Sequence, residues 1–306
     1  MAVITGGTIA IDTVKTPKAE ASQLLGGSAA YASLAASFYD TPVHLVGIIG
    51  SDYPQEHLDM LEGHGVTLSG VEKSQKESFT WTGEYMENMN DRETHAVALN
   101  VLEDWAVKVP EEIAGANIVV LANMSPENQL EMLAQCNAEN RFVIADTMDL
   151  WINIASDKLH EVLGQIDLFV LNESEARMLA ETSNLIEAGE VLLGKGPENV
   201  IIKTGEFGAI LFTKNGEMFR CPAWPLAEVA DPTGAGDSFL GAMAGYLSAK
   251  GTENFSFSDL TQGMVRGSVV ASYTCEAFST QKLQSVSREA IDSRLAQLHA
   301  MSNWEL

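Results

Sequence analysis

Short apolar runs alternate with amphipathic stretches along most of this chain. A short apolar run is typical of a buried strand, whereas apolar residues spaced three and four apart are typical of one helix face. The pattern predicts strands at residues 2–5, 43–49, 117–122, 141–145, 167–171, 199–203 and 208–212. It predicts helices near residues 28–39, 54–64, 127–138, 174–181, 185–194, 236–249, 259–275 and 287–300. Such alternation indicates an α/β protein built from βαβ units.

The runs at 117–122 and 166–171 are almost entirely apolar. Strands of a parallel sheet are buried on both faces, so they lack the alternating polar positions of a half-exposed strand. We therefore expect a mostly parallel central sheet with helices on both faces. Such sheets bind ligands at the carboxyl ends of their strands, where the segments 172–175 and 204–205 would lie.

Two other segments, approximately residues 8–20 and 78–100, alternate polar and apolar positions as antiparallel strands do. They predict a small antiparallel β sheet that projects from the core as a lid. A lid would exclude water from a reaction beneath it. Because the chain contains no evident linker or internal repeat, we expect a single domain over residues 1–306.

Composition narrows the class of protein. The 306 residues are 46% hydrophobic, enough for a substantial core. Lysine and arginine number 18 against 42 aspartates and glutamates, a net charge of −24 that argues against nucleic acid or an anionic membrane as partner. The scattered Cys136, Cys221 and Cys275 are typical of reduced thiols. With no signal-peptide pattern and no apolar stretch long enough for a membrane span, we expect a cytoplasmic protein.

The run Asp-Pro-Thr-Gly-Ala-Gly-Asp-Ser-Phe at residues 231–239 opens a predicted helix. Gly234, Ala235 and Gly236 allow close backbone approach, and a helix N-terminus favours an anion such as phosphate. Asp237 would repel a bound phosphate, yet it is well placed as a general base. The run thus predicts phosphoryl transfer to a hydroxyl, with the turn 234–237 as anion hole. The structural alternative is an ordinary helix cap in a glycine-rich turn.

This run resembles the C-terminal signature of the ribokinase-like (PfkB) family of carbohydrate and nucleoside kinases. Residues 25–32, Leu-Gly-Gly-Ser-Ala-Ala-Tyr-Ala, resemble the family's N-terminal signature. Shorter matches at 46–52, 172–175 and 203–208 follow in the family's order, so that the resemblance spans roughly residues 3–285. It implies the ribokinase-like three-layer α/β fold with a β lid, and it implies ATP and Mg²⁺ as ligands.

The resemblance assigns Asn172 to nucleotide binding and Glu175 to Mg²⁺, through water. Oxygen donors that leave several waters in place suit Mg²⁺. The alternative is a helix start in which Asn172 is the cap and Glu175 complements the helix dipole. Lys203 could offset phosphate charge, or it could be an ordinary solvent-facing residue at a strand end. The remaining nucleotide-binding candidates that the resemblance implies are Thr204, Gly205, Gly208 and Thr233.

On the acceptor side, Gly26 and Gly27 would let the backbone approach the substrate. Asp12 lies where relatives place an acid that binds sugar hydroxyls, which a carboxylate does by accepting hydrogen bonds. Tyr31 departs from the family, which commonly has Asn at this position. Its ring offers a stacking face and a phenol instead, so the acceptor specificity of relatives does not transfer to this chain.

The expected activity is ATP-dependent phosphorylation of a hydroxyl on a sugar, with Asp237 as base. A nucleoside is the alternative acceptor, because Tyr31 and aromatic residues of the lid segment could stack on a nucleobase. An alternative of another class is a non-catalytic regulator that binds a sugar or nucleotide, although such a protein has no use for a base beside phosphate. A K⁺ ion near Asp231 and a homodimer are left open by the sequence.

Overall fold

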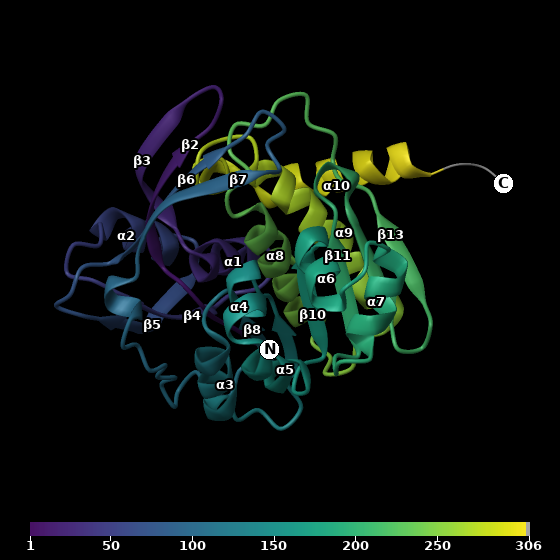
Figure 1. Ribbon diagram of the computed structural model, residues 1–306, viewed down its shortest axis with the longest axis horizontal. Helices are drawn as coiled ribbons and strands as arrows, with labels where there is room; N and C mark the ends of the chain where they lie inside the picture. The colour runs from purple at the N-terminus through teal and green to yellow at the C-terminus, as the bar shows by residue number, and fades with distance from the viewer. Residues whose placement is uncertain (304–306) are drawn as a thin grey trace.

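The computed structural model describes residues 1–303; the last three residues of the domain expected over 1–306 lie outside it. Figure 1 shows the arrangement of its elements. The strands are β1 (Val3–Gly6), β2 (Ala10–Lys15), β3 (Glu20–Gly26), β4 (Val43–Ile49), β5 (Val66–Lys73), β6 (Phe79–Tyr85), β7 (Arg92–Ala98), β8 (Ile118–Leu121), β9 (Phe142–Ala145), β10 (Leu168–Asn172), β11 (Asn199–Lys203), β12 (Ala209–Thr213) and β13 (Met218–Cys221). The helices are α1 (Ser28–Ser37), α2 (Gln55–Gly63), α3 (Pro126–Gln135), α4 (Asp149–Ile154), α5 (Ser156–Leu163), α6 (Glu173–Ala180), α7 (Leu185–Leu193), α8 (Ala235–Ala249), α9 (Phe257–Thr274) and α10 (Arg288–Ser302), with 3₁₀ turns at η1 (Asn100–Leu102), η2 (Gly205–Phe207) and η3 (Leu283–Ser285).

A nine-stranded sheet forms the centre of the molecule, in the order β13-β12-β11-β10-β9-β8-β1-β4-β5. The pairs from β11 to β5 are all parallel, whereas β12 and β13 extend the sheet in antiparallel pairing. The parallel strands end at one common edge of the sheet, so residues that follow β8, β9, β10 and β11 are brought together there.

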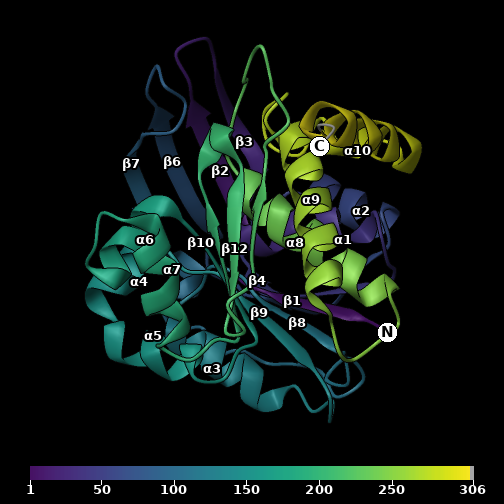
Figure 2. The ribbon, with the colours of Figure 1, turned by 90° about the vertical axis from the view of Figure 1, so that its right-hand side faces the viewer.

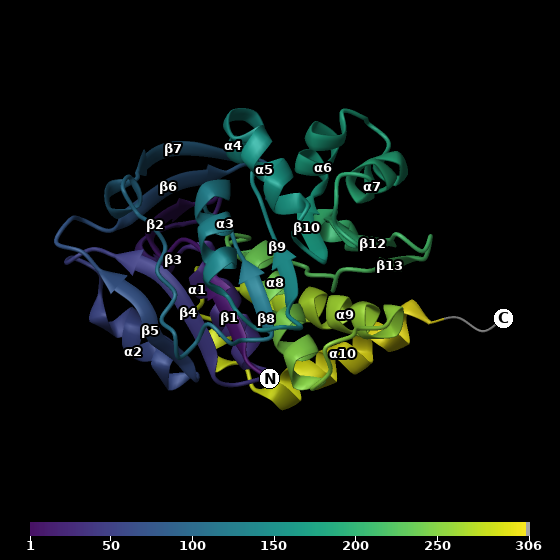
Figure 3. The same cartoon turned by 90° about the horizontal axis from the view of Figure 1, so that it is seen from below.

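Both faces of the sheet are buried. Along β10, Leu168 and Val170 belong to one apolar cluster, while Phe169 and Leu171 belong to another. This alternation explains the nearly continuous apolar run, because successive side chains point to opposite faces that are both covered. Helices α1, α2, α8, α9 and α10 cover one face and α3 to α7 cover the other (Figures 2 and 3). The predicted α/β fold with three layers is confirmed.

Helix α8 is central to the first of these layers, because it packs against both α1 and α9. Its approach to α1 is unusually close. A Cβ atom on Gly241 would overlap the carbonyl oxygen of Ala32, and one on Gly245 would overlap that of Ala36. Only glycine allows this contact, which fixes where the N-terminus of α8 lies relative to the strand ends.

A second, four-stranded sheet in the order β3-β2-β6-β7 projects from the central sheet (Figure 1). It is the lid sheet that the alternating segments predict. Two antiparallel hairpins, β2–β3 and β6–β7, are joined by parallel pairing of β2 with β6. The first lid segment extends beyond the predicted residues 8–20 to Gly26, since β3 returns alongside β2.

The predicted strands and helices are all present, with ends displaced by a few residues. Five elements go beyond the predicted set, namely β3, β5, β13, α4 and α5. Strands β5 and β13 are the two edges of the central sheet and carry several exposed or half-buried positions. An edge strand lacks the continuous apolar run of a central strand, which weakens its signal in the sequence. Of the helices in residues 1–303, none combines the length and apolar character required to cross a membrane.

Candidate active site

The carboxyl ends of four neighbouring strands open into a cleft of about 730 Å³. Asn123 follows β8, Asp146 follows β9, Asn172 ends β10 and Lys203 ends β11. The N-terminus of α8 closes the cleft from the opposite layer, and the β6–β7 hairpin of the lid forms a further wall. Among the predicted site residues, the cleft is lined by Asn172, Glu175, Lys203, Gly205, Gly208, Gly234, Ala235, Gly236 and Asp237.

The turn before α8 exposes backbone donors to the cleft. Gly234 adopts φ 76°, a left-handed conformation that glycine favours, and α8 begins at Ala235. The Ala235 N–H donates to the Pro232 carbonyl at 3.1 Å, so it closes the turn. Within residues 1–303, no acceptor pairs with the N–H of Gly234 or Gly236. These donors and the positive end of the α8 dipole favour an anion, and we call residues 234–237 the anion turn.

Tyr31 lies beneath this turn. Its side chain is 2% exposed, and a Cβ atom on Gly234 would overlap its ring. The stacking face that the sequence led us to expect is therefore covered by the turn, which corrects that interpretation. Burial, with the nearby Asp231 and Asp12 carboxylates, raises the pKa of the Tyr31 phenol well above its usual value, so the phenol stays neutral. Tyr31 supports the anion turn from below.

Asp237 lies in the first turn of α8 and is partly exposed to the cleft. The surrounding protein withdraws its carboxyl from bulk water and raises its pKa to about 6. The charge of Asp146 raises this pKa further, while Lys203 and Arg92 lower it. A carboxyl with a pKa near the working pH is well suited to accept a proton in a reaction.

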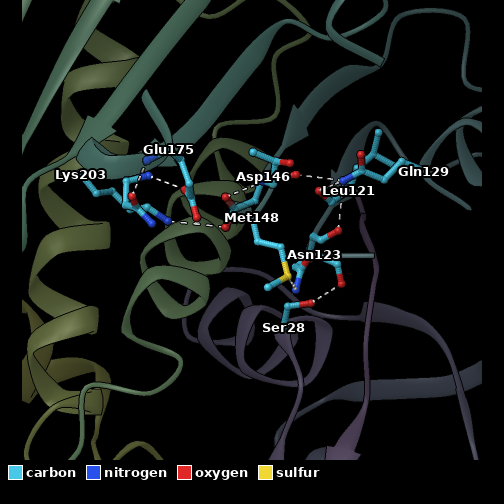
Figure 4. A network of polar contacts seen from close by, with 11 residues as sticks. Ser28, Leu121, Asn123, Gln129, Asp146, Met148, Glu175 and Lys203 are labelled. Atoms are coloured by element: carbon cyan, nitrogen blue, oxygen red, sulfur yellow. Dashed lines mark hydrogen bonds and ion pairs between the residues drawn. The ribbon is translucent and has the colours of Figure 1, made fainter. Parts of the chain in front are cut away.

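Asp146 and Lys203 form a buried ion pair at 3.5 Å (Figure 4). Burial raises the pKa of Asp146, because desolvation outweighs the attraction of Lys203. Burial alone would lower the pKa of Lys203, but the charges of Asp146 and Glu175 outweigh it and raise that pKa. Lys203 therefore remains a cation, and its Nζ would lie 2.8 Å from a Cβ atom on Gly236, next to the anion turn.

The position of Asp146 depends on Gln129, a fully buried residue of α3. The Gln129 side chain donates to the carbonyls of Leu121, Ala122 and Asp146 at 3.2, 3.2 and 2.9 Å. It thus ties the end of β8 to the end of β9. Figure 4 shows Gln129 on one side of Asp146 and Lys203 on the other.

Asn172 and Glu175 form a capping box at the start of α6. The Asn172 side chain accepts from the Glu175 N–H at 2.9 Å, and Glu175 Oε2 accepts from the Asn172 N–H at 2.8 Å. The structural alternative is thus present, yet both residues also line the cleft. Burial and the charge of Asp146 raise the pKa of Glu175 to about 7, with Lys203 acting in the opposite direction.

The turn after β11 is held by its own hydrogen bonds. Thr204 donates from its backbone N–H and its hydroxyl to the Gly208 carbonyl at 2.7 and 2.9 Å, and its side chain is absent from the cleft lining. Thr233 also stays outside the lining. Its N–H donates to Asp231 at 2.9 Å and its hydroxyl donates to Tyr85 of the lid at 3.3 Å. Neither threonine side chain lines the cleft, but each holds a turn whose neighbouring residues do.

The predicted acceptor residues meet at the base of the lid. Asp12 on β2 lies against Gly26 of β3, where any Cβ atom would overlap its carboxyl group. Asp12 Oδ1 is buried with no hydrogen-bond partner among the described residues. Burial, with the charges of Asp231 and Asp237, raises the pKa of Asp12 to about 8. Gly27, with φ 92°, precedes α1 and lies close to the Thr8 carbonyl. The unpaired oxygen is suited to accept a hydrogen bond from a ligand hydroxyl.

Tyr85, one of the aromatic residues of the predicted lid segment, lines the cleft. Other cleft residues were missed by the sequence analysis: Asp146, Asn123, Trp224 and, from the lid, Asn90 and Arg92. Asp146 carried a usable signal, because it directly follows the predicted strand 141–145 and so lies at a carboxyl end. The lid residues carried none, since their place depends on how the lid sheet lies over the cleft.

We predict that Gly234→Ala lowers thermal stability and weakens ADP binding, because it adds a Cβ atom to a left-handed residue and also overlaps Tyr31. The matched control is Gly216→Ala, since Gly216 has φ 81° with open space around it. The free energy of unfolding of the control should fall only by the conformational cost of about 1–2 kcal/mol, and the control should bind ADP normally. Thermal unfolding and calorimetry measure both effects, and equal losses in the two variants would contradict the role of the Tyr31 contact.

Known proteins are similar to this chain in sequence and in architecture. The profile described as pfkB family carbohydrate kinase matches residues 9–286. A cytidine kinase of Thermococcus kodakarensis is 30% identical over 246 residues, which cover 78% of this chain and 86% of the relative. A ribokinase of Mus musculus is 29% identical over a shorter region, 37% of this chain and 35% of the relative.

Solved structures agree in fold. A nucleoside kinase of Burkholderia thailandensis in complex with inosine has a TM-score of 0.80 at 17% identity, with 97% of this chain and 98% of the other covered. An E. coli protein described as a ribokinase II, in complex with ATP and Mg²⁺, has a TM-score of 0.78 at 19% identity, with 96% and 99% covered. Since the family profile matches nearly the whole chain, including the turn before α8 and the lid, this protein belongs to the pfkB family of carbohydrate kinases.

Proposed function

We propose that this protein transfers the γ-phosphoryl group of ATP to a hydroxyl group of a ribose-containing small molecule. The observation that carries the proposal is the partly enclosed carboxyl of Asp237, with a pKa of about 6, beside the free N–H groups of the anion turn. A carboxylate so close to an anion site would weaken mere binding of phosphate. It is useful where a hydroxyl must lose its proton as it attacks that phosphate.

In the proposed reaction Asp237 accepts the proton of the acceptor hydroxyl as its oxygen attacks the γ-phosphorus. The bond from that phosphorus to the leaving ADP oxygen breaks as the new P–O bond forms. Gly236 N–H, the α8 dipole and Lys203 offset the negative charge of the transferring group. Positioning and charge stabilisation supply most of the rate enhancement in such reactions.

The carboxylates of the cleft fit a divalent cation. Asp146 and Glu175 are buried oxygen donors whose pKa values burial raises, so a further cation beside Lys203 would stabilise their ionised forms. Mg²⁺ prefers such oxygens and retains several waters. Asp146 and Glu175 would hold Mg²⁺, directly or through water, and the ion would supply charge neutralisation for the phosphates of ATP.

For the acceptor, a nucleoside ranks ahead of a free sugar. The support is the 30% identity to a cytidine kinase, which extends over most of both chains. A free monosaccharide remains the second candidate, because Tyr31 is covered by Gly234 and offers no stacking face to a nucleobase. In either case the unpaired Asp12 oxygen would accept a hydrogen bond from a ribose hydroxyl. A non-catalytic regulator is disfavoured by the presence of Asp237.

A panel of acceptors tests the substrate class. With ATP and Mg²⁺, we expect ADP release with pyrimidine or purine nucleosides at a kcat/KM at least about tenfold above that with ribose or other free pentoses, corresponding to about 1.4 kcal/mol of additional transition-state binding. Coupled measurement of ADP gives both values. Preference for a free pentose would contradict the nucleoside assignment, and absence of turnover with every acceptor would contradict the kinase assignment.

Asp237→Asn should lower kcat by about 10²–10⁴-fold, because the amide cannot accept the proton. ATP binding, measured by calorimetry, should change little. The matched control is Asp157→Asn, since Asp157 is an exposed acid in the first turn of α5. Near-normal turnover by the Asp237 variant would remove the base assignment.

The pH dependence follows from the same carboxyl group. Because Asp237 must be ionised to act as base and its pKa is raised to about 6, kcat/KM should fall as the pH is lowered through about pH 6. Initial rates between pH 5 and about pH 8, with a saturation check for ATP at each pH, measure the profile. An activity that stays flat to the lowest pH would contradict the assignment.

A further inference from the structure

The backbone carbonyl of Asn123, at the end of β8, is bound to both segments that carry the predicted acceptor residues. It accepts from the Ser28 hydroxyl at 3.0 Å and from the Thr8 N–H at 3.2 Å. Ser28 begins α1 directly after the Gly26–Gly27 pair. Thr8 lies just before β2, the strand that carries Asp12. Asn123 therefore lies on the acceptor side of the cleft, whose lining it joins.

The orientation of the Asn123 side-chain amide is fixed by Trp151 of α4. The indole N–H of Trp151 donates to Asn123 Oδ1 at 2.8 Å. An indole nitrogen is a donor only, so the opposite orientation of the amide would set two donors against each other. The amide nitrogen therefore faces away from Trp151, toward Met148, which also lines the cleft (Figure 4).

The amide nitrogen of Asn123 has only a weak partner within the protein. It donates to the Met148 sulfur at 3.2 Å, and a thioether is a weak acceptor. Its second N–H has no acceptor in residues 1–303. The polar groups nearby are engaged, since Gln129 binds three carbonyls and Asp146 pairs with Lys203. The cleft thus presents a pre-oriented pair of N–H donors that lacks a strong acceptor.

We propose that Asn123 binds the acceptor substrate by donating a hydrogen bond to one of its oxygens, and that Trp151 is the positioning residue that keeps this amide oriented. The inference deepens the proposed kinase function and rests on it. An amide N–H binds a hydroxyl or carbonyl oxygen and rejects a group that is only a donor. The bound oxygen is distinct from the attacking hydroxyl, which gives its proton to Asp237. Loss of this bond should therefore weaken acceptor binding more than it slows phosphoryl transfer.

Asn123→Ala tests the contact by steady-state kinetics with the acceptor that the panel identifies. We expect the acceptor KM to rise about three- to tenfold, as for the loss of one neutral hydrogen bond, while kcat and the KM for ATP change by less than about twofold. Asn123→Asp keeps an oxygen for the Trp151 indole but lacks the N–H donors. It should therefore bind the acceptor no better than Asn123→Ala does.

Trp151→Phe tests the positioning role, because it removes the indole N–H and keeps an aromatic ring. It should raise the acceptor KM about two- to fivefold on its own and have no further effect in the Asn123→Ala background, since Trp151 acts through that amide. Additive effects of the two substitutions would overturn the positioning role. The matched control is Trp105→Phe, which should leave the acceptor KM unchanged. The Trp105 indole also donates to a side chain, Glu72 at 3.0 Å, but lies outside the cleft lining.

Acceptor analogues locate the oxygen that the amide binds. With cytidine, 2′-deoxycytidine and 3′-deoxycytidine as acceptors, the effect of Asn123→Ala should vanish with the analogue that lacks the bound hydroxyl. An effect that persists with both deoxy analogues and is absent with free ribose would assign the bound oxygen to the nucleobase instead.

An unchanged acceptor KM in Asn123→Ala would overturn the proposal, as would an equal rise in the KM for ATP, which no acceptor contact explains. A wild-type protein without turnover on any acceptor contradicts the proposed function instead. Calorimetric titration with cytidine and with ribose, in the presence of MgADP, still decides the inference in that case. Equal affinities of the wild type and Asn123→Ala for both compounds would overturn it.

Discussion

Close contact between α8 and α1 sets the geometry of the cleft at the carboxyl ends of the strands. Gly241 and Gly245 bring the two helices together until their backbones touch, so any larger side chain would displace α8. The N-terminus of α8 carries the anion turn and Asp237, and its Gly236 lies beside Lys203 at the end of β11. Helix α1 also supplies Tyr31, which packs beneath Gly234. One helix pair therefore holds both the turn and its support.

Electrostatics explains the chemistry available at this edge. Asp146, Glu175 and Asp237 all have raised pKa values, because the protein withdraws them from water and Lys203 only partly offsets their charge. In a chain with a net charge of −24, phosphates would be repelled at long range. Attraction must therefore be local, from Lys203, Arg92, backbone N–H groups and a divalent cation. The same excess of carboxylates that favours the cation keeps one of them basic enough to accept a proton.

The lid completes the site from residues distant in sequence. Its β6–β7 hairpin contacts the anion turn through Tyr85 and the turn after β11 through Asn90. The other hairpin carries Asp12, whose buried oxygen has no partner within the described residues. One small sheet thus contacts the anion turn and the turn after β11, and it carries Asp12 at its base.

The chain pattern predicted the buried strands of the central sheet and the covering helices other than α4 and α5. Short local signatures placed Asp237, Asn172 and Lys203 among the residues that line the cleft. These features follow from neighbours in sequence: apolar runs, strand ends and a glycine-rich helix start. The covered ring of Tyr31, the ion pair of Asp146 and the placement of Arg92 followed only from tertiary contacts. Tyr31 meets Gly234, Asp146 meets Lys203, and Arg92 faces the cleft from the lid. Burial and charge at each position depend on segments far apart along the chain, so no local pattern encodes them.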